Sequence, residues 1–304
     1  MTNVQGIPIM DNVDFTQKYT SGFDFVDTNA GVLDLSQLNI VIDVANIDQY
    51  PNEQYALLRK DGLGTSDSSI VLGVNPYTAK SELIREKCRN VLTEDELAVG
   101  DKAPVRKGRE LEPLIIHKSK QILGRNVIKP IHMYRHKEYP YIKFNFDGVM
   151  EKVELEDGSY QYIPDEIKVV TMYGQKHYDK TKAWFRESKG FQMLPEDYSK
   201  LDISIEQKAA LYGIPPYYYT QLQQQIFGCD NANGRVTPFG YLTVMFESLW
   251  EVFTFFVWRD QKVINQLIIE DTKTWNAIEA KRPDNFTLNV PILDENGNET
   301  GEIR

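Results

Sequence analysis

The segment from Tyr141 to Thr171 constrains the fold of this 304-residue chain more than any other. It contains two strand-like runs, the first closed by Asp147 and the second carrying the triplet Glu166-Ile167-Lys168. An Asp157-Gly158 pair between the runs is a strong signal for a hairpin turn. Successive side chains of a strand point to opposite faces, so Glu166 and Lys168 should share one face while Ile167 points into the core.

Two carboxylates and an ammonium group on one surface would suit a magnesium ion and an attacking water, which indicates phosphodiester hydrolysis. The alternative is a cross-strand salt bridge on an exposed sheet face. Apolar neighbours around the triplet (Ile163, Ile167, Val169 and Val170) favour an inner strand, where unpaired charges would be costly. Asp165 is a competing carboxylate, but alternation places it on the opposite face unless a bulge intervenes.

Two further residues could complete such a site. Glu112 lies in a basic helix predicted over 105–123, next to Leu111 of its apolar stripe, and therefore near the buried edge. Gln221 lies on a second predicted helix that begins at Pro215-Pro216 and ends at Gly228, and its amide could bind a nucleophile or a phosphate oxygen. Taken alone, each residue is better explained as an ordinary polar position on a helix surface.

Arg59 and Ser66 flank a glycine-bearing loop that opens a short helix, predicted over 67–72. A guanidinium, a hydroxyl and free backbone N–H groups together can form a phosphate pocket. The plainer interpretation is that Ser66 caps the helix and binds nothing.

Several other chemistries are not supported. The two cysteines, Cys88 and Cys229, are too few for a disulfide framework or an all-cysteine metal site, and they favour a reducing cytoplasm. The four histidines form no His-x-x-x-His pair, and neither a phosphate-binding Gly-x4-Gly-Lys loop nor a Gly-x-Ser-x-Gly elbow occurs. There is also no apolar run of membrane-spanning length and no secretory signal pattern at the start.

Charge is distributed unevenly along a chain whose net charge is −10. Residues 1–50 contain seven Asp and one Lys, whereas residues 101–137 contain ten Lys or Arg and three Asp or Glu. The basic stretch could attract a phosphate backbone within an otherwise acidic protein, or it could simply be a solvated helix face. Residues 1–50 show no sustained period and indicate an acidic arm or peripheral layer.

The order of expected elements indicates a mixed α/β or α+β domain around a central sheet. Further helices are expected over 55–60, 81–88, 205–212 and 260–280, a capping box at Thr93–Glu96, and strands over 239–246 and 250–258. The tail after Pro283 contains Asn296-Gly297 and is expected to be a loop or small hairpin.

Five motifs in order resemble the lambda-exonuclease/YqaJ-type viral recombinase nucleases of the PD-(D/E)xK superfamily. They are RKDGLGTSDSSIVLGVNPY, GRELEP, FDGV, EIK and IPPYYYTQLQQQ, and the resemblance extends over about residues 52–283. It implies a restriction-endonuclease-like core, with a central mixed sheet flanked by helices, that degrades DNA from duplex ends. On this basis the chain divides into an acidic extension (1–51), a nuclease domain (52–283) and a tail (284–304).

The resemblance also implies a role for each candidate residue. Glu112, Asp147, Glu166 and the carbonyl of Ile167 correspond to metal ligands for two Mg²⁺ ions, which Mn²⁺ could replace. Lys168 corresponds to the catalytic lysine, Gln221 to the glutamine that completes the site, and Arg59 with Ser66 to the 5′-phosphate pocket. Family members commonly digest the 5′-ended strand as ring-shaped trimers beside a single-strand annealing protein, here in the cytoplasm of a bacterial host.

The chain departs from the family pattern in three places: Phe146 stands where the superfamily motif has proline, the first fifty residues have no counterpart, and the 172–214 stretch is long. These departures concern oligomeric state, polarity and processivity more than the chemistry. Two other functions also stay open. One is an endonuclease or single-strand nuclease of the same superfamily, and the other is a non-catalytic DNA-end-binding or protein-interaction module on the same fold.

Overall fold

The computed structural model describes residues 30–47, 50, 52–98, 102–154, 160–284, 286–288, 291–294 and 298–303. Helices in these ranges are α1 (Asn52–Leu58), α2 (Ser68–Val71), α3 (Lys80–Lys87), α4 (Glu94–Leu97), α5 (Ala103–Leu123), α6 (Ile205–Tyr212), α7 (Pro216–Gly228) and α8 (Gln261–Glu279). None of these helices is long and apolar enough to cross a bilayer.

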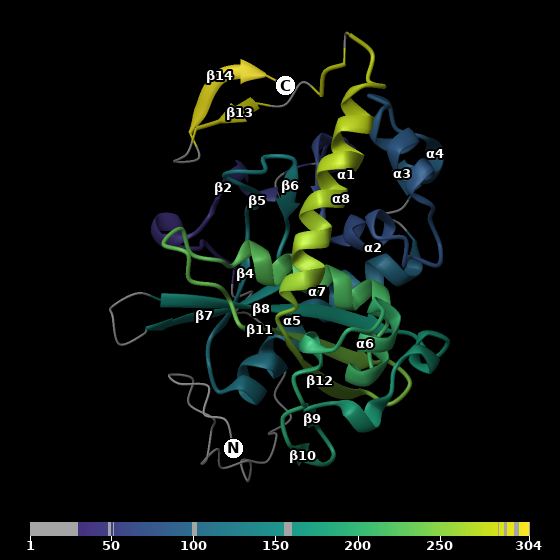
Figure 1. Cartoon of the computed structure of the whole chain (residues 1–304), viewed down its shortest axis with the longest axis vertical. Helices are drawn as coiled ribbons and strands as arrows, with labels where there is room; N and C mark the ends of the chain where they lie inside the picture. The colour runs from purple at the N-terminus through teal and green to yellow at the C-terminus, as the bar shows by residue number, and fades with distance from the viewer. Residues whose placement is uncertain are drawn as a thin grey trace.

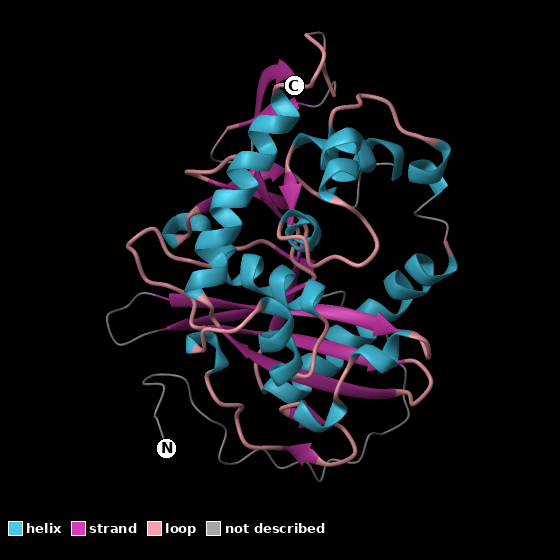
Figure 2. Ribbon diagram, turned by 45° about the vertical axis from the view of Figure 1, so that its right-hand side comes forward, coloured by secondary structure: helices cyan, strands magenta, loops and turns pink. Residues whose placement is uncertain are grey.

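An eight-stranded mixed sheet forms the centre of the protein (Figures 1 and 2). Its strands, in spatial order, are β1 (Ala30–Gly31), β4 (Val127–Pro130), β7 (Gly148–Glu154), β8 (Tyr160–Val170), β11 (Phe239–Phe246), β12 (Glu251–Trp258), β9 (Phe185–Arg186) and β10 (Gly190–Phe191). β8 is antiparallel to β7 and parallel to β11, and the chain crosses between β8 and β11 through α6 and α7. The prediction of a mixed sheet flanked by helices is therefore confirmed.

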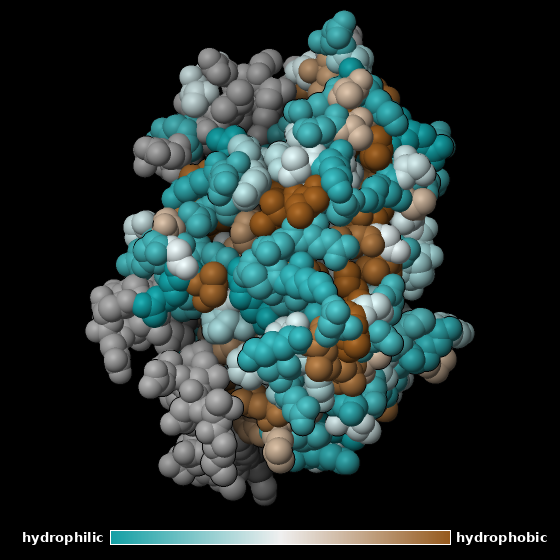
Figure 3. All heavy atoms as spheres, viewed as in Figure 1, coloured by the Kyte–Doolittle hydropathy of each residue, from teal (hydrophilic) through white to brown (hydrophobic). Residues whose placement is uncertain are grey.

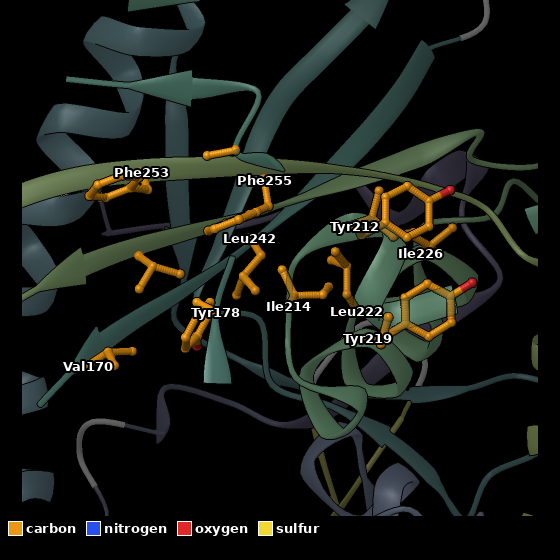
Figure 4. Packing of buried hydrophobic residues seen from close by; sticks show 14 of the residues in the cluster. Val170, Tyr178, Tyr212, Ile214, Tyr219, Leu222, Ile226, Leu242, Phe253 and Phe255 are labelled. Carbon is orange, nitrogen blue, oxygen red and sulfur yellow. The ribbon is translucent and has the colours of Figure 1, made fainter. Parts of the chain in front are cut away.

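Side chains of β11, β12 and the second half of β8 alternate between the two faces of this sheet. Leu242 and Phe255 point towards Leu222 of α7 in one cluster, where buried residues of α6 and α8 also gather (Figure 4). Met245 and Ile167 belong to the cluster on the other face, which α5 covers with Ile115, Ile116, Ile122 and Leu123. Apolar residues recur every second residue along the strands and about every 3.6 residues along the helices. The strands therefore have two apolar faces, and one layer of helices covers each.

The strands of a smaller sheet are, in spatial order, β2 (Ile40–Val44), β5 (Met133–His136), β6 (Ile142–Phe144) and β3 (Leu63–Gly64). It packs around Tyr134, Phe144 and Phe146, which are almost fully buried. Beyond it, β13 (Pro291–Leu293) and β14 (Glu299–Ile303) pair as the small hairpin expected for the tail, and α8 runs along the long axis towards it (Figure 1). The Asn296-Gly297 turn itself, like Asp157-Gly158, lies outside the described residues.

The acidic first segment is not purely peripheral. From Ala30 onwards it contributes β1 to the large sheet and β2 to the small one, and Leu33, Leu38 and Ile40 are buried. The expectation of an arm is therefore wrong for residues 30–47, whose short strands are defined by pairing with distant segments. The division at residue 51 stays a prediction, as does the one at residue 284.

Most predicted helices occur close to their expected limits. α6 and α7 match within a residue, because Ser204 forms a capping box with Gln207 and Pro216 occupies the first turn of α7. Asp260 caps α8 through the N–H of Val263.

The molecular surface on the face in Figure 3 is mainly hydrophilic, with separate hydrophobic patches.

Candidate active site

The candidate site is built on two adjacent inner strands of the large sheet, β7 and β8. Gly148 of β7 pairs with Asp165 of β8, which places Asp147, just before β7, beside the Glu166–Lys168 part of β8. Phe146 is buried and stacks with its ring centroid 5.8 Å from that of Phe144, so an aromatic anchor precedes the aspartate where the superfamily motif has proline. Ile167 and Asp165 point to the opposite face, as alternation predicted, and Asp165 accepts a hydrogen bond from Ser119 of α5.

Lys168 lies between the two carboxylates. Its Nζ is 2.7 Å from Oδ2 of Asp147 and forms a second ion pair with Glu166. The Lys168 and Asp147 side chains are 21% and 25% exposed, whereas Glu166 is fully buried. The site is therefore open to solvent on the side of Lys168 and Asp147, and closed behind Glu166.

Helix α7 closes the site behind Glu166. Gln221 and Gln225 lie one turn apart on α7, and the side-chain amide of each donates to a different carboxylate oxygen of Glu166. Gln221 therefore contacts Glu166, another residue of the candidate site. The sequence analysis did not single out Gln225, although its i, i+4 spacing from Gln221 on a predicted helix was an available signal.

Glu112 approaches from α5, which covers the other face of the sheet. Its side chain is 18% exposed, and Nζ of Lys129 on β4 lies 2.7 Å from its Oε1. That oxygen is nevertheless buried without a hydrogen-bond partner, so the ion pair lacks hydrogen-bond geometry. Lys129 is a second residue that the sequence analysis missed, because its pairing depends on how β4 ends beside the start of β7.

The electrostatics of the cluster show an excess of negative charge. Burial, and then the charge of Asp147, raise the pKa of Glu166 to about 8, although Lys168 opposes the shift. Burial and Asp147 also raise the pKa of Glu112. Burial disfavours the charge on Lys168, but Asp147 and Glu166 outweigh it and keep its pKa well above the ordinary value. The lysine is therefore a cation held between Asp147 and Glu166.

This donor set fits a divalent metal ion. A Mg²⁺ site presents hard oxygen ligands. Here they include a buried carboxylate oxygen of Glu112 without a hydrogen bond, and carboxylates whose pKa values are raised by burial and by the neighbouring charge of Asp147. In the described ranges, however, no three Asp, Glu, His or Cys side chains gather closely enough to bind one ion as they stand. Lys168 and Lys129 are the cations that the carboxylates face instead.

Arg59 and Ser66 also come together. Nη2 of Arg59 donates to Oγ of Ser66 at 3.0 Å. The expectation that Ser66 caps the following helix is wrong, because Ser66 lies within a 3-10 turn (Thr65–Asp67) that precedes α2. The Asp67 side chain instead accepts the N–H of Gly64 at 2.9 Å.

A buried ion pair fixes the loop that carries this pair. Nζ of Lys87 on α3 lies 2.8 Å from Oδ2 of Asp67 and donates to the carbonyl oxygen of Arg59 at 2.6 Å. At the next residue, Oγ of Ser68 donates to Oγ1 of Thr220, the neighbour of Gln221, at 3.3 Å. The loop of Arg59 and Ser66 is therefore attached to the helix that closes the candidate site.

Comparison with known proteins gives the class of this chain. Residues 54–230 match the family described as the YqaJ-like viral recombinase domain. The match covers more than half of the chain, and every candidate site residue lies within it. The chain belongs to this family.

Among solved structures, the chain is similar to an alkaline exonuclease, LHK-Exo, from Laribacter hongkongensis, with 15% identity and a TM-score of 0.42 over 73% of this chain and 90% of that one. LHK-Exo in complex with dAMP gives 17% identity and a TM-score of 0.46 over 75% and 93%. None of the curated proteins compared with the chain matches it significantly.

Proposed function

We propose that this protein is a metal-dependent exonuclease that hydrolyses duplex DNA from its ends during phage-type recombination. The observation that carries the proposal is the convergence of Asp147, Glu166, Lys168 and Gln221 from three elements onto one partly open site. Membership of the YqaJ-like viral recombinase family supports the same conclusion.

The charge and exposure of each side chain indicate its role in the proposed reaction. Asp147, Glu166 and Glu112, with the carbonyl of Ile167, would bind the metal. Bound Mg²⁺ would supply a water with a lowered pKa and charge stabilisation at the phosphate. Lys168 keeps its proton and lies on the exposed side, where its ammonium can orient the water and neutralise charge that develops on the phosphate.

The two glutamines act on Glu166 from behind. By donating to both of its oxygens, Gln221 and Gln225 favour its ionised form and fix its orientation. Gln221, which is half-buried, is also the one able to reach a nucleophile or a phosphate oxygen with the rest of its amide.

Dependence on DNA ends would come from Arg59 and Ser66. A guanidinium beside a hydroxyl recognises the doubly charged terminal phosphate better than the singly charged internal diester. Capture of a 5′-phosphate there would make digestion proceed 5′→3′. Two Mg²⁺ ions (or Mn²⁺ in their place), a trimeric ring, a single-strand annealing partner and action in the bacterial host cytoplasm complete the proposal by family resemblance.

Substitution of Lys168 tests the mechanism. Because one preorganised electrostatic group contributes about 100- to 1000-fold to such reactions, Lys168→Ala should lose at least about 100-fold in digestion of 5′-phosphorylated linear duplex. Lys273→Ala, which removes an exposed lysine paired with Glu270 on α8, is the matched control and should retain activity. Digestion by a folded Lys168→Ala protein at the control rate would reject the mechanism.

A further inference from the structure

A pair of aromatic rings lies beside the candidate site, and the chemistry described so far does not use it. Tyr77 is 72% exposed, although it is large and apolar over most of its surface. Its ring packs edge to face against that of Tyr217 in the first turn of α7, with the ring centroids 6.0 Å apart. Tyr217 itself is only half-buried. The pair therefore offers aromatic surface to solvent.

The main chain at Tyr77 is firmly positioned. Oδ1 of Asn75 accepts the N–H groups of Tyr77 and Thr78 at 2.9 and 3.0 Å. Nδ2 of Asn75 in turn donates to Oγ of Ser69 on α2 at 2.9 Å, and the carbonyl oxygen of Ser69 accepts two further N–H groups of this turn. A tyrosine kept exposed on a rigid turn loses little conformational entropy when it binds a flat partner.

These rings continue directly into the candidate site. The Tyr217 and Tyr218 ring centroids are 4.6 Å apart, and Nζ of Lys168 lies 5.7 Å from the centroid of the Tyr218 ring. The turn of Tyr77 follows α2, which begins just after Ser66, and α2 packs against α7. The rings are thus connected to the catalytic lysine on one side and to the Arg59–Ser66 loop on the other.

We infer that Tyr77 and Tyr217 form a stacking platform for a nucleobase at the end of the strand being cut. Every base has an apolar π-face, so stacking on aromatic rings binds single-stranded nucleotides without regard to sequence. A strand whose end is separated from its complement exposes such faces next to the scissile bond. The inference rests on the proposed function and deepens it, because it makes unpaired terminal bases part of what the site recognises.

The test combines protein variants with a modified substrate. Linear duplexes would carry one abasic nucleotide at the first, second or third position of the strand that the wild-type protein digests. Since stacking of a base on an aromatic side chain contributes about 1–3 kcal/mol, Tyr77→Ala and Tyr217→Ala should lower kcat/KM about fivefold or more on intact duplex. Tyr77→Phe and Tyr217→Phe keep the rings and should stay close to wild type.

The decisive comparison is between the abasic nucleotide in the substrate and the alanine substitutions in the protein. An abasic nucleotide at one of the three positions should slow the wild-type protein about as much as the alanine substitutions do, and should slow the alanine variants no further. If the abasic nucleotide lowers kcat/KM equally in the wild-type protein and in the alanine variants, the platform is overturned. It is also overturned if light scattering shows that the alanine variants lose activity only because their subunit association has changed. A wild-type protein that digests no duplex with Mg²⁺ would instead refute the underlying function.

Discussion

At the scale of single residues, the candidate site depends on how buried charges are compensated. Glu166 has no access to water, and its partners are one ammonium group and two amides. Lys168 therefore neutralises carboxylates in the free protein and, in the proposed function, would remain a cation near the substrate. Charged hydrogen bonds of this kind contribute more than neutral ones, so their loss should be measurable.

Gln225 gives the first prediction at this scale. Gln225→Leu removes one donor to Glu166 and should lower kcat about tenfold, because a hydrogen bond to a charged group contributes about 1.5–3 kcal/mol. The adjacent Gln224 is buried, but neither polar atom of its side chain has a partner. Gln224→Leu is therefore a matched control, expected to leave kcat unchanged. Steady-state digestion of linear duplex measures both; equal rates for the two variants would contradict the role given to Gln225.

Arg59 gives the second prediction at the scale of single residues. Arg59→Ala should reduce initiation on 5′-phosphorylated duplex about tenfold or more, with a much smaller effect on 5′-hydroxyl duplex, because the lost guanidinium acts on the terminal phosphate. Arg85→Ala on α3, which removes an exposed arginine paired with Glu82, should change neither rate. Initial rates on the two substrates provide the comparison. A uniform loss on both would place Arg59 outside an end-recognition pocket.

At the scale of elements, local signals fixed the helices better than the strands. The capping box at Ser204, the proline at the start of α7 and the left-handed Gly124 after α5 are properties of neighbouring residues, so the sequence alone specifies them. β1 and β9 contain two residues each; β1 pairs with β4, and β9 pairs with β12 and β10. No local pattern predicts such strands, because their stability comes from distant partners.

Gly228 shows how tertiary contacts override the intrinsic helix propensity of a residue. A Cβ at Gly228, in the last turn of α7, would lie 2.5 Å from the ring of Phe144, which is fully buried. Gly228→Ala should therefore lower the free energy of unfolding by about 1–3 kcal/mol. Gly108→Ala in α5 has open space around the new methyl group and should instead be stabilising by about 1 kcal/mol. Urea unfolding of both variants measures the difference; two shifts of the same sign would refute the packing of α7 on β6.

At the scale of the whole molecule, the residues of the candidate site could be proposed from the sequence, but not all of the side chains that they contact. Alternation alone correctly separated Glu166 and Lys168 from Ile167 and Asp165. The pairing of Glu112 with Lys129 depends on where α5 crosses β4, and that of Glu166 with Gln225 on where α7 crosses β8. Such crossings follow from the strand order of the sheet, which is a property of the complete chain.

The central claim is that the acidic cluster and Lys168 form a metal-dependent hydrolytic site for DNA ends. The most direct measurement is a time course with end-labelled linear duplex and covalently closed circular DNA, each with Mg²⁺ or with a chelator. We expect the linear duplex to be degraded only with Mg²⁺ and the circle to stay intact under both conditions. Degradation of linear duplex at the same rate in the chelator, or cleavage of the circle, would contradict the account.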